Sequence, residues 1–126
     1  MKAARQFIQG ERDAELFGAV GPLLVERGVH ASLGTPVTAD PGDVWLIVPA
    51  EGPATGFAIA RRGDDAHLRH LYSANDGDRK RLLMAVEKWA RSTGASEVYT
   101  IDRAGWWSSA GYTPTPARGS YLRWTK

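Results

Sequence analysis

The sequence contains no cysteine, and this absence excludes disulfide bonds, thiolate metal ligands and a cysteine nucleophile. It also lacks any apolar run near the ~20 residues that a membrane-spanning helix needs. The longest apolar run, Val44–Val48, has the length of a buried strand. The N-terminus begins basic but no apolar core follows it, so no signal peptide is expected. These absences favour a cytoplasmic protein with no membrane partner.

Length and composition predict one globular domain over residues 1–126, because 43% of the residues are hydrophobic and 24% are charged. The net charge is +2, but it is unevenly distributed. Residues 1–65 carry six Lys/Arg and nine Asp/Glu, whereas residues 66–126 carry ten and five. The basic half is either a solvated surface or a site for a phosphate-rich ligand, such as a coenzyme or a nucleic acid.

The N-terminal part predicts a weak strand over Arg5–Gln9 and then a helix. Apolar residues at three- and four-residue spacing define one face of that helix: Leu16, Phe17, Val20, Leu23 and Leu24. Gly21-Pro22 interrupts the pattern and predicts a kink or two short helices, with Gly28 as the stop. Residues 31–43 are rich in Gly and Pro and predict a loop.

A hairpin is predicted from Val44–Pro49 and Gly56–Arg62, followed by a strand over Ala66–Ser73. Regular alternation in that strand would place Leu68, His70 and Tyr72 on one face. The next helix spans Asp78–Thr93 and ends at Gly94, with Asn75 or Asp76 as its N-cap. Its apolar stripe is Leu82, Leu83, Val86, Trp89 and Ala90.

The C-terminal part predicts a strand over Glu97–Ile101, a short helix over Ala104–Ala110 closed by Gly111, and a last strand over Gly119–Thr125. The residues expected in the core are Leu16, Val20, Leu24, Leu46, Val48, Phe57, Ile59, Leu68, Leu83, Val86, Trp89, Val98 and Ile101.

Three segments in this order resemble the GCN5-related N-acetyltransferase (GNAT) superfamily. Leu71-Tyr72-Ser73 resembles the end of the family's strand 4, and 82–90 resembles its helix after the phosphate loop. Trp106–Tyr112 resembles its late aromatic segment. The resemblance implies an α+β fold in three layers, with a mixed, mostly antiparallel central sheet that is flanked by helices and splayed after strand 4.

The resemblance also implies an N-acyltransferase, in which an amine attacks the thioester of acetyl-coenzyme A, or of another acyl-coenzyme A, directly in a ternary complex. Backbone amides freed at the splay would bind the pantetheine arm, here at Leu71, Tyr72 and Ser73. The helix start would bind the pyrophosphate through exposed amides and its dipole. By resemblance this involves Gly77, Asp78, Arg79, Lys80 and Arg81.

The phosphate loop, 74–81, is shorter than the family's loop and departs from its pattern. Gly77 falls on the first glycine, but Arg79 stands where a second Gly or Ala belongs, and Ala74 stands where Gln or Arg belongs. Asp76 and Asp78 bring negative charge beside any pyrophosphate, which opposes its binding. The alternative interpretation is a capped helix with a solvated basic first turn.

A second departure is Trp107, which stands where family members often carry a tyrosine that protonates the departing thiolate. An indole N–H is a poor general acid, so Trp107 is either a contact of the coenzyme or a core residue. The candidate bases are His70, which titrates near neutral pH, and Asp102, just past a strand end. Either residue can instead have a structural role. His30 and His67 are isolated, and no metal site is expected.

Three hypotheses remain open from the sequence. The first is an acyltransferase acting on a small-molecule or protein amine. The second is a catalytically degenerate GNAT-fold binding or regulatory protein, which the short loop, Ala74 and Trp107 favour. The third is a nucleic-acid-directed protein, which the basic C-terminal half and Trp106, Trp107 and Trp124 permit. By resemblance, 31–43 lies on the acceptor side, and edge strands can pair two subunits into a homodimer.

Overall fold

The computed structural model describes residues 4–26, 28–29, 33 and 37–126 of the chain. The helices whose bounds lie in this part are α1 (Asp13–Leu24), α3 (Asp76–Ser92) and the 3-10 helix η1 (Trp106–Ala110), and Gly28, Val29 and Leu33 are also helical. The strands are β1 (Arg5–Ile8), β2 (Val44–Val48), β3 (Gly56–Arg61), β4 (Ala66–Ser73), β5 (Val98–Asp102), β6 (Thr113–Pro116) and β7 (Leu122–Thr125).

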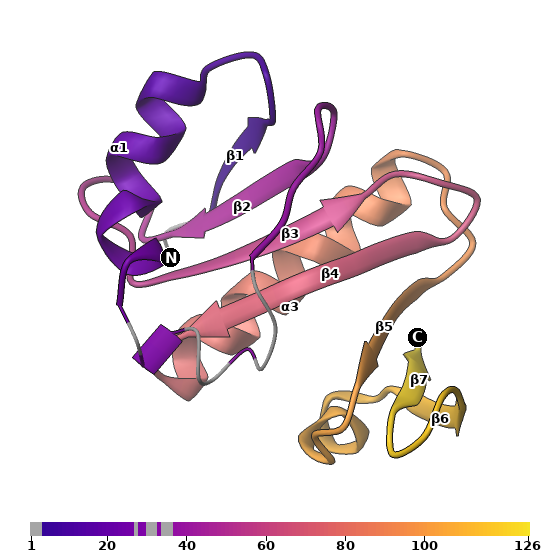
Figure 1. Cartoon of the computed structure of the whole chain (residues 1–126). Coiled ribbons are helices and arrows are strands. Elements are labelled where there is room, and N and C mark those ends of the chain that lie inside the picture. Colours follow the sequence, from indigo (N-terminus) through magenta and orange to yellow (C-terminus); the bar gives the residue numbers. More distant parts are fainter. Residues whose placement is uncertain (1–3, 27, 30–32, 34–36) are drawn as a thin grey trace.

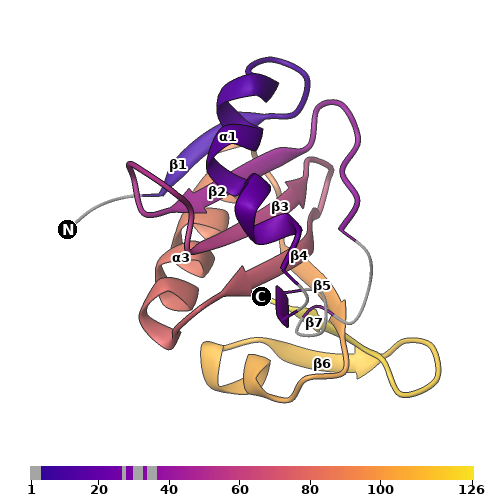
Figure 2. The same cartoon turned by 60° about the vertical axis from the view of Figure 1, so that its left-hand side comes forward.

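These strands form one sheet in the order β1-β2-β3-β4-β5-β7-β6 (Figure 1). Every neighbouring pair is antiparallel except β4 and β5, which run parallel. Helix α1 lies on one face, over β1 to β3, and α3 lies on the other (Figures 1 and 2). This is the three-layer, mostly antiparallel α+β fold that the sequence predicts.

The sheet separates two hydrophobic clusters. Leu68, Leu82 and Trp107 belong to the cluster on the α3 face, whereas Leu16 and Phe57 belong to the cluster under α1. Strand β2 contributes to both through alternate residues, which is why its whole apolar run is buried.

Eleven of the predicted core residues are buried, and Leu24 is half-buried. Ile101 is 43% exposed, so its prediction is wrong. Val98 packs on the α3 face, and the two-residue period of a strand turns Ile101 to the opposite side.

The structure corrects the predicted break in the N-terminal helix and describes only part of the predicted loop 31–43. Helix α1 is continuous, with Pro22 inside its last turn, so the split into two helices is wrong. A proline so close to the end removes little of the intrahelical hydrogen bonding. Of the predicted loop, residues 31–32 and 34–36 lie outside the described residues, as does His30. Leu33 is helical, so the prediction is wrong there, and residues 37–40 have no regular structure.

Strand β4 contains a β-bulge at Arg69. Leu68 pairs with Ala60 and His70 pairs with Ile59, so two residues of β4 advance for one of β3. Leu68 therefore packs on the α3 face, while Tyr72 packs on the α1 face with its ring centroid 6.1 Å from that of Phe57. The prediction of one shared face for Leu68, His70 and Tyr72 is wrong, because an extra residue reverses the alternation.

Gly56, at the start of β3, lies directly against the backbone of β4. A Cβ atom there would lie 2.8 Å from the carbonyl oxygen of Tyr72. Because backbone cannot yield as a flexible side chain does, Gly56→Ala is expected to lower the free energy of unfolding by about 1–3 kcal/mol. Urea denaturation measures this value.

Gly18 in α1 provides the matched control, because a Cβ atom there meets nothing within 4 Å. Gly18→Ala is expected to raise the free energy of unfolding by about 0.5–1 kcal/mol through helix propensity. Equal effects of the two substitutions would contradict the close approach of β3 and β4.

Candidate functional site

Strands β4 and β5 separate soon after they begin. Their parallel pairing joins Ala66 with Val98 and His67 with Tyr99, and the two strands then diverge (Figure 1). Beyond His67, no described strand pairs with this edge of β4, although peptide groups need hydrogen-bond partners when they are buried. The gap, called here the β4–β5 splay, therefore offers a row of backbone donors and acceptors to an extended ligand.

A cavity of about 200 Å³ lies at this splay. It brings together six of the residues that the sequence singled out: His70, Leu71, Ser73, Arg79, Asp102 and Trp107. Leu33, from the segment expected on the acceptor side, and Trp106, from the late aromatic segment, also line it. The residues that the sequence did not indicate as site residues are Arg69, Thr100, Ile101, Ala104 and Tyr121.

Five other predicted residues do not line this cavity: Tyr72, Gly77, Asp78, Lys80 and Arg81. The bulge turns Tyr72 toward the α1 face. Gly77 and Lys80 are exposed in the first turns of α3. Arg81 lines a different hollow, along α3 and β2. Of the predicted phosphate-loop residues, Arg79 is the one that reaches the cavity.

Asp78 fastens the start of α3 to the β2–β3 connection. Its backbone N–H donates to Asn75 Oδ1 at 2.8 Å, which confirms Asn75 as the N-cap. Its carboxylate, 7% exposed, accepts from Thr55 Oγ1 at 2.9 Å and from Arg81 Nη1 at 3.0 Å. These contacts give Asp78 a structural role, since its oxygens are directed into the protein.

Arg79 extends from α3 to η1. Its guanidinium carbon lies 4.1 Å from the ring centroid of Trp106, and its Nη2 lies 3.1 Å from Asp76 Oδ1. A cation over an indole face is held by the ring quadrupole. Arg79 is therefore a positioned positive charge between the start of the helix and the cavity.

Trp107 and Asp102 form a bonded pair on the other wall. Trp107 is 2% exposed, and its Nε1–H donates to Asp102 Oδ2 at 2.9 Å. Asp102 Oδ1 accepts from the backbone N–H groups of Arg103 at 2.7 Å and Ala104 at 3.3 Å. Trp107 is thus a core residue and Asp102 caps the turn that follows β5, the structural roles named above for each. Both residues also line the cavity.

Two tyrosines occur near the C-terminus, and they differ in position. Tyr112 is 3% exposed and donates its hydroxyl to Glu87 Oε2 at 3.0 Å. Burial, together with the Glu87 charge, raises the pKa of Tyr112 far above its usual value, and this residue does not line the cavity. Tyr121 does line it, with the Arg103 guanidinium 5.3 Å from its ring centroid.

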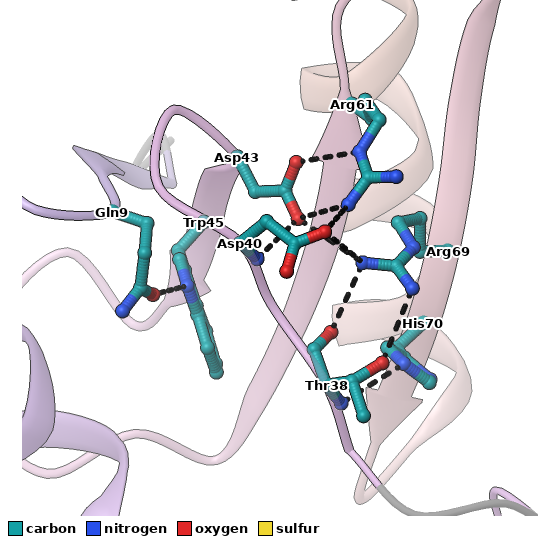
Figure 3. A network of polar contacts seen from close by, with 8 residues as sticks. All are labelled: Gln9, Thr38, Asp40, Asp43, Trp45, Arg61, Arg69 and His70. Carbon is teal, nitrogen blue, oxygen red and sulfur yellow. Dashed lines mark hydrogen bonds and ion pairs between the residues drawn. The ribbon is translucent and has the colours of Figure 1, made fainter.

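The segment Thr38–Asp43, called here the strap, is fixed against β3 and β4 by ion pairs (Figure 3). Asp43, 2% exposed, accepts from Arg61 Nε at 3.0 Å and Arg69 Nη1 at 3.2 Å. Asp40 pairs with Arg61 as well. Burial alone would raise the pKa of Asp43, but the Arg61 contact and the Asp40 N–H outweigh it and lower the pKa.

The strap also contacts the candidate base. Thr38 N–H donates to His70 Nε2 at 3.3 Å, and Arg69 Nη2 donates to Thr38 Oγ1 at 3.2 Å (Figure 3). Two consecutive residues of β4 reach one strap residue because the bulge interrupts the alternation. Burial, and next the Arg69 charge, lower the pKa of His70 below its ordinary value of 6.5, while Asp43 and the backbone hydrogen bond with Thr38 oppose them.

A larger hollow of about 590 Å³ lies along α3 and β2, away from the splay, and includes Leu46, Met84 and Lys88. None of the five predicted strand-end and base residues, from His70 to Ser73 and Asp102, lines it. Within the described residues, no group of three or more His, Asp or Glu side chains could hold a metal ion. No helix in that part of the chain is long and apolar enough to cross a membrane.

No protein-family model matches the sequence, and no curated protein matches it. Solved structures match its fold. An acyl-CoA N-acyltransferase from Pseudomonas aeruginosa superposes with a TM-score of 0.74 at 12% identity, over 98% of this chain and 97% of that one. Aminoglycoside 6'-acetyltransferase type Ii superposes with a TM-score of 0.67 at 15% identity, over 97% and 96%.

A Bacillus subtilis acetyltransferase in complex with coenzyme A superposes with a TM-score of 0.59 at 12% identity, over 97% of both chains. At such identities the likeness shows the fold alone. The strand order, the single parallel pair and the splay together give this chain the fold of the GCN5-related N-acetyltransferases, as the sequence predicts.

Proposed function

We propose that this chain is a divergent GNAT-type acyltransferase that moves an acetyl or other acyl group from coenzyme A to an amine. The observation that carries the proposal is the cavity at the β4–β5 splay, which six of the sequence-predicted residues line. A neighbour of the same fold was solved in complex with coenzyme A. Function still has to be argued from this site, because one fold hosts many activities.

The residues present fit the donor in two places. The unpaired edge of β4, near Leu71 and Ser73, suits the pantetheine arm, because its peptide groups can continue the ladder with an extended ligand. The start of α3 has the positive end of the helix dipole, and the Arg79 guanidinium lines the cavity beside it, which suits an anionic pyrophosphate. The carboxylate oxygens of Asp78 remain hydrogen-bonded to Thr55 and Arg81, and so are directed away from the phosphate.

The reaction forms a C–N bond, breaks a C–S bond and moves one proton from nitrogen to sulfur. The amine nitrogen attacks the carbonyl carbon of the thioester, the C–S bond breaks, and the proton lost by the nitrogen finally resides on the sulfur. Holding the two reactants together in the cavity contributes much of the rate. Trp107 uses its N–H on Asp102, so water or another side chain would deliver the proton.

The acceptor is a small-molecule or protein amine that enters beside the strap and Tyr121, opposite the first turn of α3. The strap meets β4 at His70, and Tyr121 lines the same cavity from the turn before β7. The homodimer through edge strands stays a prediction.

Arg79→Ala is expected to weaken coenzyme A binding about tenfold or more, because a charge-assisted hydrogen bond contributes about 1.5–3 kcal/mol. Calorimetric titration with coenzyme A gives the dissociation constant. Lys88→Ala is the matched control, since Lys88 is an exposed cation of the same helix that does not line the cavity. Equal affinity of wild type and Arg79→Ala would remove Arg79 from the phosphate site.

The proposed activity is tested by incubating the protein with acetyl-coenzyme A and a panel of amines. We expect thiol release that depends on the amine, together with an acylated product in the mass spectrum. Binding of the coenzyme with no acylated product from any amine in the panel would count against the transferase.

That outcome would favour the second candidate, a coenzyme-binding or regulatory module that has lost catalysis. The specific observation behind it is that two late aromatic donors are already engaged in hydrogen bonds within the protein. Trp107 donates to Asp102, and Tyr112 is buried and donates to Glu87. Neither group is placed to protonate a leaving thiolate at the splay.

A further inference from the structure

His70 is held in one orientation by the strap. Its Nε2 lies 3.3 Å from the backbone nitrogen of Thr38, and Thr38 is also bound by Arg69 through its hydroxyl and its carbonyl oxygen. Arg69 in turn pairs with the buried Asp43. A chain of polar contacts therefore runs from the interior to one nitrogen of an imidazole in the cavity wall (Figure 3).

The direction of the Thr38 hydrogen bond decides where the imidazole proton lies. A backbone N–H can only donate, so His70 Nε2 must accept and carries no proton. In a neutral imidazole the proton then resides on Nδ1. Within the described part of the chain, Nδ1 makes no hydrogen bond, so the N–H that His70 can offer to a ligand is this one.

The surroundings of His70 lower its pKa and so favour the neutral ring. Burial lowers the pKa most and the Arg69 guanidinium lowers it further, while Asp43 and the backbone hydrogen bond with Thr38 raise it in part. The other charged or titratable groups near this part of the protein lie on the strap, β3, β4, α3, β5 and the turn before β7: Asp40, Arg61, His67, Arg79, Asp102 and Tyr121.

We infer that His70 acts in this cavity as a neutral hydrogen-bond donor through Nδ1–H, and not as the base that takes the amine proton. The inference rests on the proposed function, in which the carbonyl oxygen of the thioester gains negative charge as the amine attacks. A fixed donor beside that oxygen stabilises the transition state. The strap residue Thr38 is then a positioning residue, because its amide sets the tautomer and the orientation of the ring.

The tautomer can be measured without any activity. A long-range 1H–15N spectrum of 15N-labelled protein distinguishes a proton on Nδ1 from one on Nε2, and His70→Asn and His67→Asn identify the two signals. We expect the Nδ1–H tautomer at His70 and a titration midpoint below that of an ordinary histidine. A proton on Nε2, or a titration midpoint near the ordinary histidine value, would overturn the inference even if the protein is an active acyltransferase.

Kinetics separates a donor from a base once an acceptor amine is known. Asn places an amide N–H near the position of Nδ1 but cannot take up a proton, whereas Ala does neither. We expect His70→Ala to lower kcat about 100-fold, as loss of a transition-state donor does, and His70→Asn to recover most of it. Equal losses in both variants, with loss of a pH-rate limb that the wild type shows, would assign His70 as the base.

Discussion

Trp107→Ala is expected to lower the free energy of unfolding by about 4 kcal/mol, within the range for truncating a buried Trp. The side chain is 2% exposed and belongs to the cluster on the α3 face. Its ring lies 4.0 Å from Trp106 and 5.2 Å from Tyr112, measured between centroids. Truncation would remove these contacts and leave Asp102 Oδ2 without its donor.

Urea denaturation of wild type, Trp107→Ala and Trp106→Ala tests this expectation. Trp106 is half-buried and stacks on Trp107 from the side of Arg79, so its truncation is expected to cost about 1 kcal/mol. If Trp107→Ala were as mild as Trp106→Ala, Trp107 would not be the core residue that fixes η1 and the cavity wall.

Asp43→Ala is expected to lower the free energy of unfolding by about 3 kcal/mol, the lower end of the range for breaking a buried ion pair. The substitution leaves the Arg61 and Arg69 guanidiniums without their main buried partner. The lower end applies because the Arg61 side chain is 41% exposed and water can solvate it. Arg69 would also lose the ion pair that holds its guanidinium against Thr38.

Asp40→Ala is the matched control, since Asp40 joins the same two arginines but its side chain is 69% exposed. Its removal is expected to cost less than about 1 kcal/mol. Thermal or urea unfolding of the two variants compares them directly. Equal losses would mean that the strap is held by surface charge and not by the buried carboxylate.

The pH dependence of stability follows from the same carboxylate. The pKa of Asp43 is lower in the folded protein than its ordinary value of 3.8. The unfolded state therefore binds the proton more readily, so the stabilisation from Asp43 is complete above the ordinary pKa and is lost as the pH falls through the folded pKa. Asp43→Ala should accordingly show a shallower loss of stability in acid than wild type.

The central and C-terminal elements could be predicted closely because their signals are local. The apolar stripe of α3, its N-cap Asn75 and the Gly94 that follows its end all arise within a few neighbouring residues. Gly111, with a φ of 90°, ends η1 as expected for a left-handed C-terminal position. These elements are the ones that bring Leu71, Arg79 and Trp107 to one cavity.

The remaining features depend on contacts between distant segments. No local signal marks the bulge at Arg69, which is set by the pairing of β4 with β3 and reverses the faces of the following residues. The sequence does not indicate strand β6, since Pro114 and Pro116 are unusual in a strand. Strand β6 lies at the edge of the sheet and pairs with β7, and proline is tolerated in such an edge strand. Without β6, the position of Tyr121 in the cavity wall could not be derived.

In the candidate site, too, the residues could be predicted from local sequence, but their contacts could not. Residue types and order indicated His70 and Asp102, and both line the cavity. Their hydrogen-bond partners depend on the strap and on the turn after β5. The ion pairs of Asp43 with Arg61 and Arg69 join residues far apart in the sequence, so no spacing rule could have revealed them.

Calorimetric titration of the protein with acetyl-coenzyme A tests the central claim most directly, because it asks whether the β4–β5 splay and the first turn of α3 bind the donor. We predict one site per chain with a dissociation constant in the micromolar range, which corresponds to about −8 kcal/mol. Binding should be weaker in Arg79→Ala and unchanged in Lys88→Ala. Absence of binding up to millimolar coenzyme would contradict the proposal that this site holds the donor.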